Sequence, residues 1–371
     1  MSGGSLRVTG GSVDVTIAEG HVAPTAAGGA VLDARGLHVL PGLLDLQVNG
    51  AAGIDLTHQP ERLWEVAAAL PRYGVTAFLP TIITSAPQAR ERALAVLAAG
   101  PPAGWTGAVP LGLHLEGPMI APARKGAHPP RWLTEPSADL VAGWSRAAGV
   151  AMVTLAPELP GALDVVTALA ERDVVVALGH TEATPEQMTA AADRGARAVT
   201  HLGNAMPALA GRLPGPVGAA LADPRLTVGV IADGHHLHPT TVAAFAGALG
   251  PGRLLAVTDC TAALGMPDGP ARLGDQAVVV REGTVRLEDG TLAGSAADLP
   301  ACLRVLRAAT GCSLGEAVAS ATTVPAALLG DPSRGTLAPG ARGDLVLVDD
   351  DLTVVATVVG GRVLHDRRGG R

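Results

Sequence analysis

Four side chains that can bind a metal or move a proton each follow a short apolar run: Glu116, His180, His201 and Asp259. Because buried parallel strands read as apolar runs, each of these side chains is predicted to lie at the carboxyl end of a strand, where ligands bind in α/β proteins. One carboxylate and two imidazoles suit zinc and leave a fourth position for water, whose pKa the metal lowers toward about 7. Asp259 is then the candidate general base and acid.

Each of the four residues also has a purely structural interpretation. The two histidines could end unrelated strands, Glu116 could form a salt bridge at the rim, and Asp259 could cap the following helix. Separate structural roles explain the positions of all four residues together less well than they explain the position of any single one. The sequence therefore favours a shared site.

The middle of the chain alternates apolar runs with helical patterns, and two helix starts have capping boxes, at Thr184 with Gln187 and at Ser313 with Glu316. Parallel strands with intervening helices predict a (β/α)8 barrel, with a doubly wound open sheet as the alternative. A hairpin at 278–287 and a helix at 298–309 are predicted next. The eight predicted strands are residues 43–48, 77–79, 109–115, 150–155, 174–178, 198–200, 228–231 and 254–258.

Short strand-like runs separated by glycine turns occur at both ends of the chain. Neither end has enough strands to close a core alone. We therefore predict a small β-sandwich domain built from residues 1–41 and 335–371, and a barrel domain spanning 42–334.

Composition narrows the function classes. Of the 371 residues 48% are hydrophobic, yet no apolar run reaches the roughly 18 to 20 residues that span a bilayer. The net charge of −7, without a basic cluster, argues against a nucleic-acid partner. Cys260, Cys302 and Cys312 are odd in number and form no Cys-x-x-Cys pair, which argues against disulfides. Residues 1–5 do not resemble a signal peptide, so we expect a cytoplasmic protein without a membrane partner.

A set of motifs runs along nearly the whole chain in a fixed order: residues 41–50, 114–118, 125–128, 179–180, 201–207, 232–234, 257–259 and 292–295. Together they resemble the N-acetylglucosamine-6-phosphate deacetylase family of the amidohydrolase superfamily. The resemblance implies that Glu116, His180 and His201 bind one divalent metal and that Asp259 is catalytic. It also implies that His128 orients and polarises the substrate amide.

The resemblance further implies a set of substrate contacts. The sugar phosphate would meet Asn204, Ala205 and Arg212, whose amide and guanidinium donors suit a dianion. His236 matches the histidine after the Ala-Asp-Gly motif, but His235 precedes it and either could reach substrate. Ala127 adjoins His128, and a loop of Leu292, Ala293 and Gly294 resembles the one that covers the sugar.

The first barrel strand departs from the wider superfamily. It offers Gln47 and Asn49 where many amidohydrolases carry two histidines, and the fourth strand has no lysine. The only lysine, Lys125, lies in a predicted loop. A second tightly bound metal is therefore not expected near Gln47 and Asn49, as in the Gln-x-Asn mononuclear branch, whereas a weak second metal there is left open. We expect one zinc ion per subunit, while iron, manganese and cobalt suit the same ligands.

The resemblance implies a hydrolase acting on a linear amide C–N bond. The expected reaction converts N-acetyl-D-glucosamine 6-phosphate to D-glucosamine 6-phosphate and acetate in amino-sugar catabolism or recycling. Three alternatives remain open: the same reaction on N-acetylgalactosamine 6-phosphate, another amidohydrolase reaction such as one on a cyclic amide, and a catalytically inactive barrel. Relatives are commonly dimers, so we expect a homodimer, in which Arg212 could act across the interface.

Overall fold

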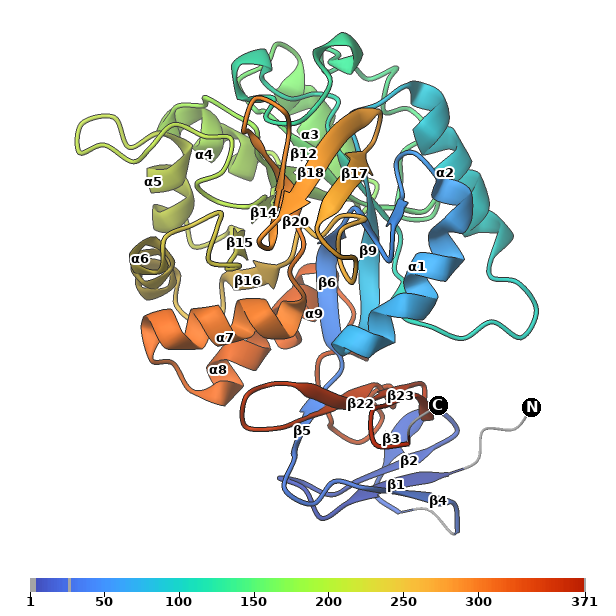
Figure 1. Ribbon diagram of the computed structural model, residues 1–371. Helices are drawn as coiled ribbons and strands as arrows, with labels where there is room; N and C mark the ends of the chain where they lie inside the picture. The colour runs from blue at the N-terminus through green and yellow to red at the C-terminus, as the bar shows by residue number, and fades with distance from the viewer. Residues whose placement is uncertain (1–4, 26–27, 370–371) are drawn as a thin grey trace.

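The computed structural model describes residues 5–25 and 28–369 and contains a nearly closed parallel barrel (Figure 1). The predicted (β/α)8 architecture is confirmed, and every predicted strand overlaps an observed one. The predicted third strand, residues 109–115, is two strands in the structure. Its first part is β10 (Val109–Pro110), which pairs with β9, and its second part belongs to β11. The barrel order is β6 (Leu43–Val48), β9 (Val75–Ile83), β11 (Leu113–Glu116), β12 (Val150–Leu155), β13 (Val175–Leu178), β14 (Ala198–Val199), β15 (Thr227–Ile231) and β16 (Leu254–Val257).

The barrel closes between its last and first strands through a short seam. Cys260, just after β16, forms a parallel bridge with Val48, and the Asn49 amide donates to the Cys260 carbonyl at 2.8 Å. The buried carboxylate of Asp45 adds a side-chain link, because the Thr258 hydroxyl donates to it at 2.5 Å. These bonds bring Asn49 and Asp259 to one edge of the seam.

Helices cover the outside of the barrel (Figure 1). Both predicted capping boxes are confirmed, at the start of α4 and of α8. The helix expected near Asp298 is α7, which Asp298 caps. The helices are α1 (Leu63–Ala69), α2 (Pro87–Ala99), α3 (Ala162–Ala170), α4 (Pro185–Asp193), α5 (Gly215–Ala222), α6 (Pro239–Leu249), α7 (Leu299–Thr310), α8 (Leu314–Ala319) and α9 (Thr323–Leu328).

A long loop replaces the helix between β11 and β12. Residues 117–149, all described, contain only the 3-10 turns η3 (Pro122–Arg124) and η4 (Pro130–Trp132). Prolines at 118, 122, 129, 130 and 136 interrupt any helix here, because proline lacks an amide hydrogen and clashes with the preceding turn. The loop is free to fold back over the barrel mouth, and it carries His128.

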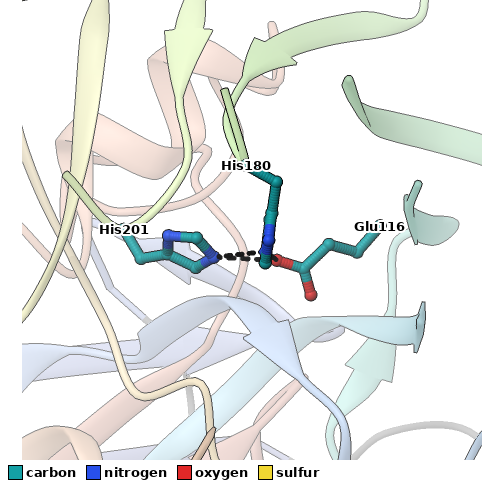
Figure 2. A group of neighbouring side chains, drawn as sticks. All are labelled: Glu116, His180 and His201. Atoms are coloured by element: carbon teal, nitrogen blue, oxygen red, sulfur yellow. Dashed lines mark hydrogen bonds and ion pairs between the residues drawn. The ribbon is translucent and has the colours of Figure 1, made fainter. Parts of the chain in front are cut away.

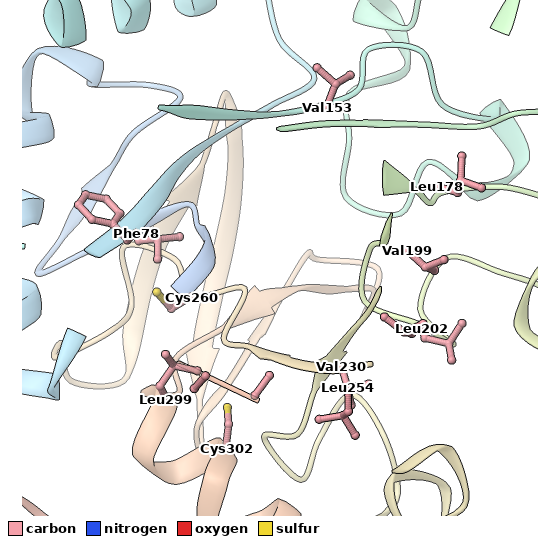
Figure 3. Close-up of a cluster of buried hydrophobic side chains, with 14 of the residues drawn as sticks. Phe78, Val153, Leu178, Val199, Leu202, Val230, Leu254, Cys260, Leu299 and Cys302 are labelled. Atoms are coloured by element: carbon pink, nitrogen blue, oxygen red, sulfur yellow. The ribbon is translucent and has the colours of Figure 1, made fainter. Parts of the chain in front are cut away.

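The barrel strands are buried on both faces, as their apolar runs predict. Figure 3 shows side chains of the strands, such as Phe78, Leu178 and Val199, in a cluster that also includes Leu299 and Cys302 of α7. This packing against the helices holds the strand ends in place.

Both chain ends meet in two four-stranded sheets below the barrel (Figure 1). Their shared core includes Ile17 of the first sheet and Leu347 of the second. The predicted sandwich is thus confirmed, whereas the domain limits at 41/42 and 334/335 stay a prediction. The first sheet is β3 (His21–Ala23), β2 (Val15–Ala18), β1 (Leu6–Thr9) and β4 (Ala30–Asp33), and the second is β23 (Arg362–Asp366), β22 (Val354–Val359), β21 (Leu345–Val348) and β5 (His38–Pro41).

A four-stranded antiparallel meander follows β16 and lies across the barrel in Figure 1. It consists of β17 (Gly269–Leu273), β18 (Gln276–Arg281), β19 (Thr284–Arg286) and β20 (Leu292–Ser295). The predicted hairpin is β18 and β19, while β17 and β20 were not predicted. A small hairpin of β7 (Gly50–Ala51) and β8 (Ile54–Asp55) follows β6. Among the described residues, no helix is long and apolar enough to cross a bilayer.

Candidate active site

Glu116, His180 and His201 converge from three barrel strands (Figure 2). Glu116 ends β11, while the histidines follow β13 and β14. The Oε1 atom of Glu116 lies 3.2 Å from Nε2 of His180 and 2.9 Å from Nε2 of His201, and the two Nε2 atoms are 3.1 Å apart. All three side chains are buried. The predicted ligands therefore form one cluster that could hold a metal ion.

The surroundings of the cluster suit a cation. Nδ1 of His180 lies 2.8 Å from the Arg124 carbonyl, which can only accept, so the ring proton is on Nδ1 and Nε2 presents a lone pair. Gln47 donates to Oε1 of Glu116 at 3.1 Å and holds that carboxylate in place. Burial alone would raise the pKa of Glu116, but the adjacent rings of His180 and His201 keep that pKa well below its usual range. A carboxylate oxygen and imidazole nitrogens at such short separations fit a divalent metal.

Asp259 lies beside this cluster, at the tip of the eighth strand. Its Oδ1 accepts a hydrogen bond from Nδ2 of Asn49 at 2.7 Å. Burial, together with the nearby Glu116 carboxylate, raises the pKa of Asp259 to about 7. Such a carboxyl can both take up and release a proton near neutral pH, as the predicted role requires. Asp259 does not cap a helix. The next helix along the chain is α7, which follows an antiparallel meander and is capped by Asp298.

His128 reaches the cluster from the long loop after β11. Its Nε2 lies 3.9 Å from Oε2 of Glu116, and its ring centroid lies 4.5 Å from that of His180. Its Nδ1 lies 2.8 Å from the hydroxyl oxygen of Thr84. Burial, followed by the neighbouring His180, lowers the pKa of His128 to about 3, which favours a neutral ring.

A cavity of about 330 Å³ opens over these groups, and most of the predicted substrate residues line it. His236 is at its wall, held by a 2.7 Å contact between its Nδ1 and Oδ2 of Asp233, whereas His235 is exposed outside it. The predicted residues lining the cavity are Glu116, Ala127, His128, His180, His201, Asn204, Ala205, His236, Asp259, Leu292, Ala293 and Gly294.

Arg212 is the predicted site residue that does not line the cavity of its own chain. It is exposed in the loop between β14 and α5, which projects away from the barrel beside α5 (Figure 1). Its neighbours Leu209 and Leu213 are 53% and 78% exposed. Within one chain, therefore, the structure separates Arg212 from the other proposed phosphate contacts.

Several residues that the sequence did not single out also belong to the site. Thr84 follows β9, a strand from which no site residue was predicted, and contacts His128. Asn49, considered only as a possible second-metal position, instead binds Asp259. His114 is a buried histidine inside the barrel, with Nε2 at 2.7 Å from the Thr154 hydroxyl. A polar residue directly after an apolar run was the available signal for Thr84.

Comparison with known proteins identifies the family to which the chain belongs. Residues 38–364 match the model of the amidohydrolase family. The chain belongs to the amidohydrolase family. Members of this family depend on a metal, in agreement with the buried Glu/His/His cluster.

Three relatives show how close the similarity is. The chain is 39% identical to N-acetylglucosamine-6-phosphate deacetylase from Homo sapiens, over 91% of this chain and 86% of that protein. It is 38% identical to N-acetylgalactosamine-6-phosphate deacetylase from Escherichia coli O157:H7, over 87% and 86% of the two proteins. A solved mutant of N-acetyl-D-glucosamine-6-phosphate deacetylase from Mycobacterium smegmatis, in complex with N-acetyl-D-glucosamine-6-phosphate, is 36% identical, with a TM-score of 0.88 over 98% of this amidohydrolase and 100% of that chain.

Proposed function

We propose that this amidohydrolase removes the acetyl group of N-acetyl-D-glucosamine 6-phosphate, giving D-glucosamine 6-phosphate and acetate. The observation that carries the proposal is the convergence of Glu116, His180 and His201 beside Asp259 and His128 in one cavity. Relatives that bear this activity in their names are similar along most of the chain, which supports the substrate class.

The residues have distinct parts in the reaction. Glu116, His180 and His201 would hold one divalent cation, which when bound lowers the pKa of a coordinated water toward about 7 and polarises the amide carbonyl. Asp259 accepts a proton from the attacking water and returns it to the amine nitrogen as the C–N bond breaks. His128 orients the substrate amide beside the metal ligands and helps to polarise its carbonyl group.

We propose zinc as the metal, because two imidazoles and a carboxylate form a common zinc set, and a single ion because Gln47 and Asn49 are neutral amides already bonded to Glu116 and Asp259. A cytoplasmic location remains our proposal. It is supported by three cysteines that form no disulfide among the described residues.

The test is acetate release by purified protein reconstituted with zinc, iron or manganese. We expect release from N-acetylglucosamine 6-phosphate and little from the unphosphorylated sugar, since the phosphate contacts contribute to binding. Metal content is measured on the same samples. A protein that takes up metal but releases no acetate from any phosphorylated N-acetyl sugar contradicts the proposal.

A second candidate substrate is N-acetylgalactosamine 6-phosphate, favoured by the 38% identity to a deacetylase named for that sugar. The two sugars differ in the orientation of one hydroxyl group. Comparing kcat/KM for both substrates in the same assay decides between them.

We also propose a homodimer in which Arg212 contacts the phosphate in the partner's site. The exposed Leu209 and Leu213 beside it support a contact surface. Mixing Arg212→Ala chains with Asp259→Asn chains tests the idea, because a hybrid dimer then contains one intact site. We expect each variant alone to be poorly active and the 1:1 mixture to recover up to about a quarter of wild-type activity. A mixture no more active than its components contradicts the shared site.

A further inference from the structure

The wall of the cavity contains a histidine whose ring is held by a buried carboxylate. His236 and Asp233 lie in the turn between β15 and α6, and their side chains are 5% and 2% exposed. Nδ1 of His236 lies 2.7 Å from Oδ2 of Asp233, which is the distance of a direct hydrogen bond. The neighbouring His235 is exposed and does not line the cavity. The turn therefore presents one of its two histidines to the site.

The backbone fixes the other oxygen of Asp233. Its Oδ1 accepts hydrogen bonds from the amides of His235 and His236, each at 2.8 Å. Burial alone would raise the pKa of Asp233, but the His236 ring and the two amides outweigh burial and lower that pKa below its usual value. The carboxyl group is thus ionised at neutral pH, and it cannot rotate without losing both amide bonds.

These contacts determine where the proton of the His236 ring lies. An ionised carboxylate can only accept, so Nδ1 of His236 is the donor, and in a neutral ring Nε2 then carries a lone pair. Nε2 is accessible and has no hydrogen-bond partner among the described residues. Because His236 lines the cavity, this nitrogen is open to a bound molecule.

We propose that Asp233 is a positioning residue for substrate binding: its carboxylate keeps the His236 proton on Nδ1, so that Nε2 accepts a hydrogen bond from a hydroxyl group of the sugar. A sugar hydroxyl suits this nitrogen because it has a hydrogen to donate, whereas a phosphate dianion has none. The inference rests on the proposed function, in which a phosphorylated N-acetyl sugar occupies the cavity.

The first test is Asp233→Asn, which keeps the shape of the side chain and reverses its hydrogen bond to the ring. The two backbone amides need an acceptor, so the asparagine oxygen takes the place of Oδ1 and its NH2 group faces Nδ1 of His236. Nδ1 must then accept, and Nε2 carries the proton. We expect KM for N-acetylglucosamine 6-phosphate to rise about 5- to 10-fold, the effect of one neutral hydrogen bond, with kcat within about twofold and metal content unchanged.

Asp349→Asn is the matched control for the turn. Oδ1 of Asp349 also accepts from two backbone amides, those of Asp351 and Thr353 at 3.1 and 2.8 Å, but this turn lies between β21 and β22 of the sandwich. The control variant should keep the KM of the wild type. An equal rise of KM in both variants would overturn the proposal, and so would an unchanged KM in Asp233→Asn.

The second test asks whether Asp233 acts through His236. Asp233→Asn is combined with His236→Ala in a double-mutant cycle, where we expect no loss of kcat/KM beyond that of His236→Ala alone. Full additivity of the two losses would overturn the proposal, because Asp233 would then act through the backbone of the turn.

A readout without turnover separates this inference from the proposed function. Nitrogen-15 spectra of the histidine rings, recorded at about pH 8 and assigned to His236 by difference with His236→Ala, report which ring nitrogen carries the proton. At this pH an ordinary histidine, with a pKa of about 6.5, is neutral. We expect Nδ1–H in the wild type and in Asp349→Asn, and Nε2–H in Asp233→Asn.

Two results of these spectra would overturn the role of Asp233 even if acetate is released. One is the same pattern in the wild type and in Asp233→Asn, and the other is a wild-type ring that carries both protons. The expected change of tautomer in a protein that releases no acetate would instead refute the proposed substrate and support the control of the His236 ring by Asp233.

Discussion

Several residues around the cavity adopt a backbone conformation that side chains disfavour. The φ angles of His180, His201, Ala205 and Asp259 are +50°, +32°, +51° and +52°. A residue other than glycine in the left-handed region costs on the order of 1 kcal/mol or more, and such residues collect at functional sites. At the ends of β13 and β14 and after β16 this conformation accompanies side chains that converge on one point. The strain is therefore located where the proposed chemistry needs exact side-chain placement.

The role of Asp259 can be tested with little disturbance of its backbone. Asparagine tolerates the left-handed conformation better than most residues, so Asp259→Asn should keep the fold. It cannot exchange a proton, and we expect kcat to fall about 10²- to 10⁴-fold with metal content retained. Acetate release and metal analysis measure both effects. The exposed Asp164→Asn is the control and should behave as wild type; unchanged activity in Asp259→Asn would remove this residue from the mechanism.

Gly294 offers a test of crowding beside Asp259. Its φ is +72°, and an added Cβ would lie 2.7 Å from the carbonyl oxygen of Asp259 and 2.6 Å from Cγ2 of Thr261. Gly290, with φ +88°, has open space around its Cα. Both Gly→Ala changes carry the left-handed backbone cost of about 1 kcal/mol, but only Gly294→Ala should also lower kcat, by about tenfold or more. Thermal unfolding and kcat are measured for both; equal losses of kcat would show that crowding at Asp259 has no effect.

At the scale of elements, the predictable part of the structure is the part with a repeating pattern. Apolar runs predicted the barrel strands, and the boxes at Thr184 and Ser313 predicted helix starts, because burial and capping act locally on the sequence. The strand ends then predicted that Glu116, His180, His201 and Asp259 meet.

The missed contacts depend on tertiary structure instead. Nothing in the sequence distinguishes Thr84 from the other threonines. It belongs to the site only because the loop after β11 folds back and brings His128 into contact with its hydroxyl. His128 itself was found through a resemblance, since no periodic pattern describes residues 117–149. Arg212 was assigned to the site in the same way, and no pattern within one chain indicates which surface it would meet.

The meander β17 to β20 is connected to the His128 loop by its first turn. Asp275 forms an ion pair with Arg131 and accepts from Nε1 of Trp132 at 3.2 Å, while Gln276 donates to the Ala127 carbonyl at 2.6 Å. These bonds hold the meander against the loop that lines the cavity.

We expect Asp275→Ala to raise KM about fivefold, which corresponds to the roughly 1 kcal/mol of a partly exposed charged contact, with kcat within about twofold. Steady-state kinetics on the phosphorylated substrate provide the measurement. Asp268→Ala is the control, because Asp268 accepts from the Glu282 amide within the meander and should leave KM unchanged. A similar rise in KM for both variants would indicate general loosening of the meander instead.

For the whole molecule, closure of the barrel depends on a seam that contains a buried acid. Asp45 is 1% exposed and accepts from the Thr258 hydroxyl and from the amides of Gln47 and Thr258. Burial raises the pKa of Asp45 to about 6, despite these hydrogen bonds. Burying this carboxyl therefore costs less when it is protonated, although each of the three hydrogen bonds favours the ionised form.

This linkage gives a pH dependence of stability. The unfolded pKa of an aspartate is about 3.9, so between about pH 4 and pH 6 the folded state binds the proton more tightly than the unfolded chain. The contribution of Asp45 to the free energy of unfolding is thus fully present below about pH 4 and is lost as pH rises through about 6, by at most about 3 kcal/mol.

The variant Asp45→Asn tests this pH dependence, because it cannot titrate. Its amide can donate to the Thr258 hydroxyl while its oxygen accepts from the two backbone amides. We expect the difference in unfolding free energy between Asp45→Asn and wild type, measured by urea titration from pH 4.5 to 7.5, to shift in favour of the variant as pH rises. Asp55, whose pKa burial also raises to about 6, is present in both proteins and cancels in this difference. A difference that does not change with pH would mean that Asp45 titrates in the folded protein as it does in the unfolded chain.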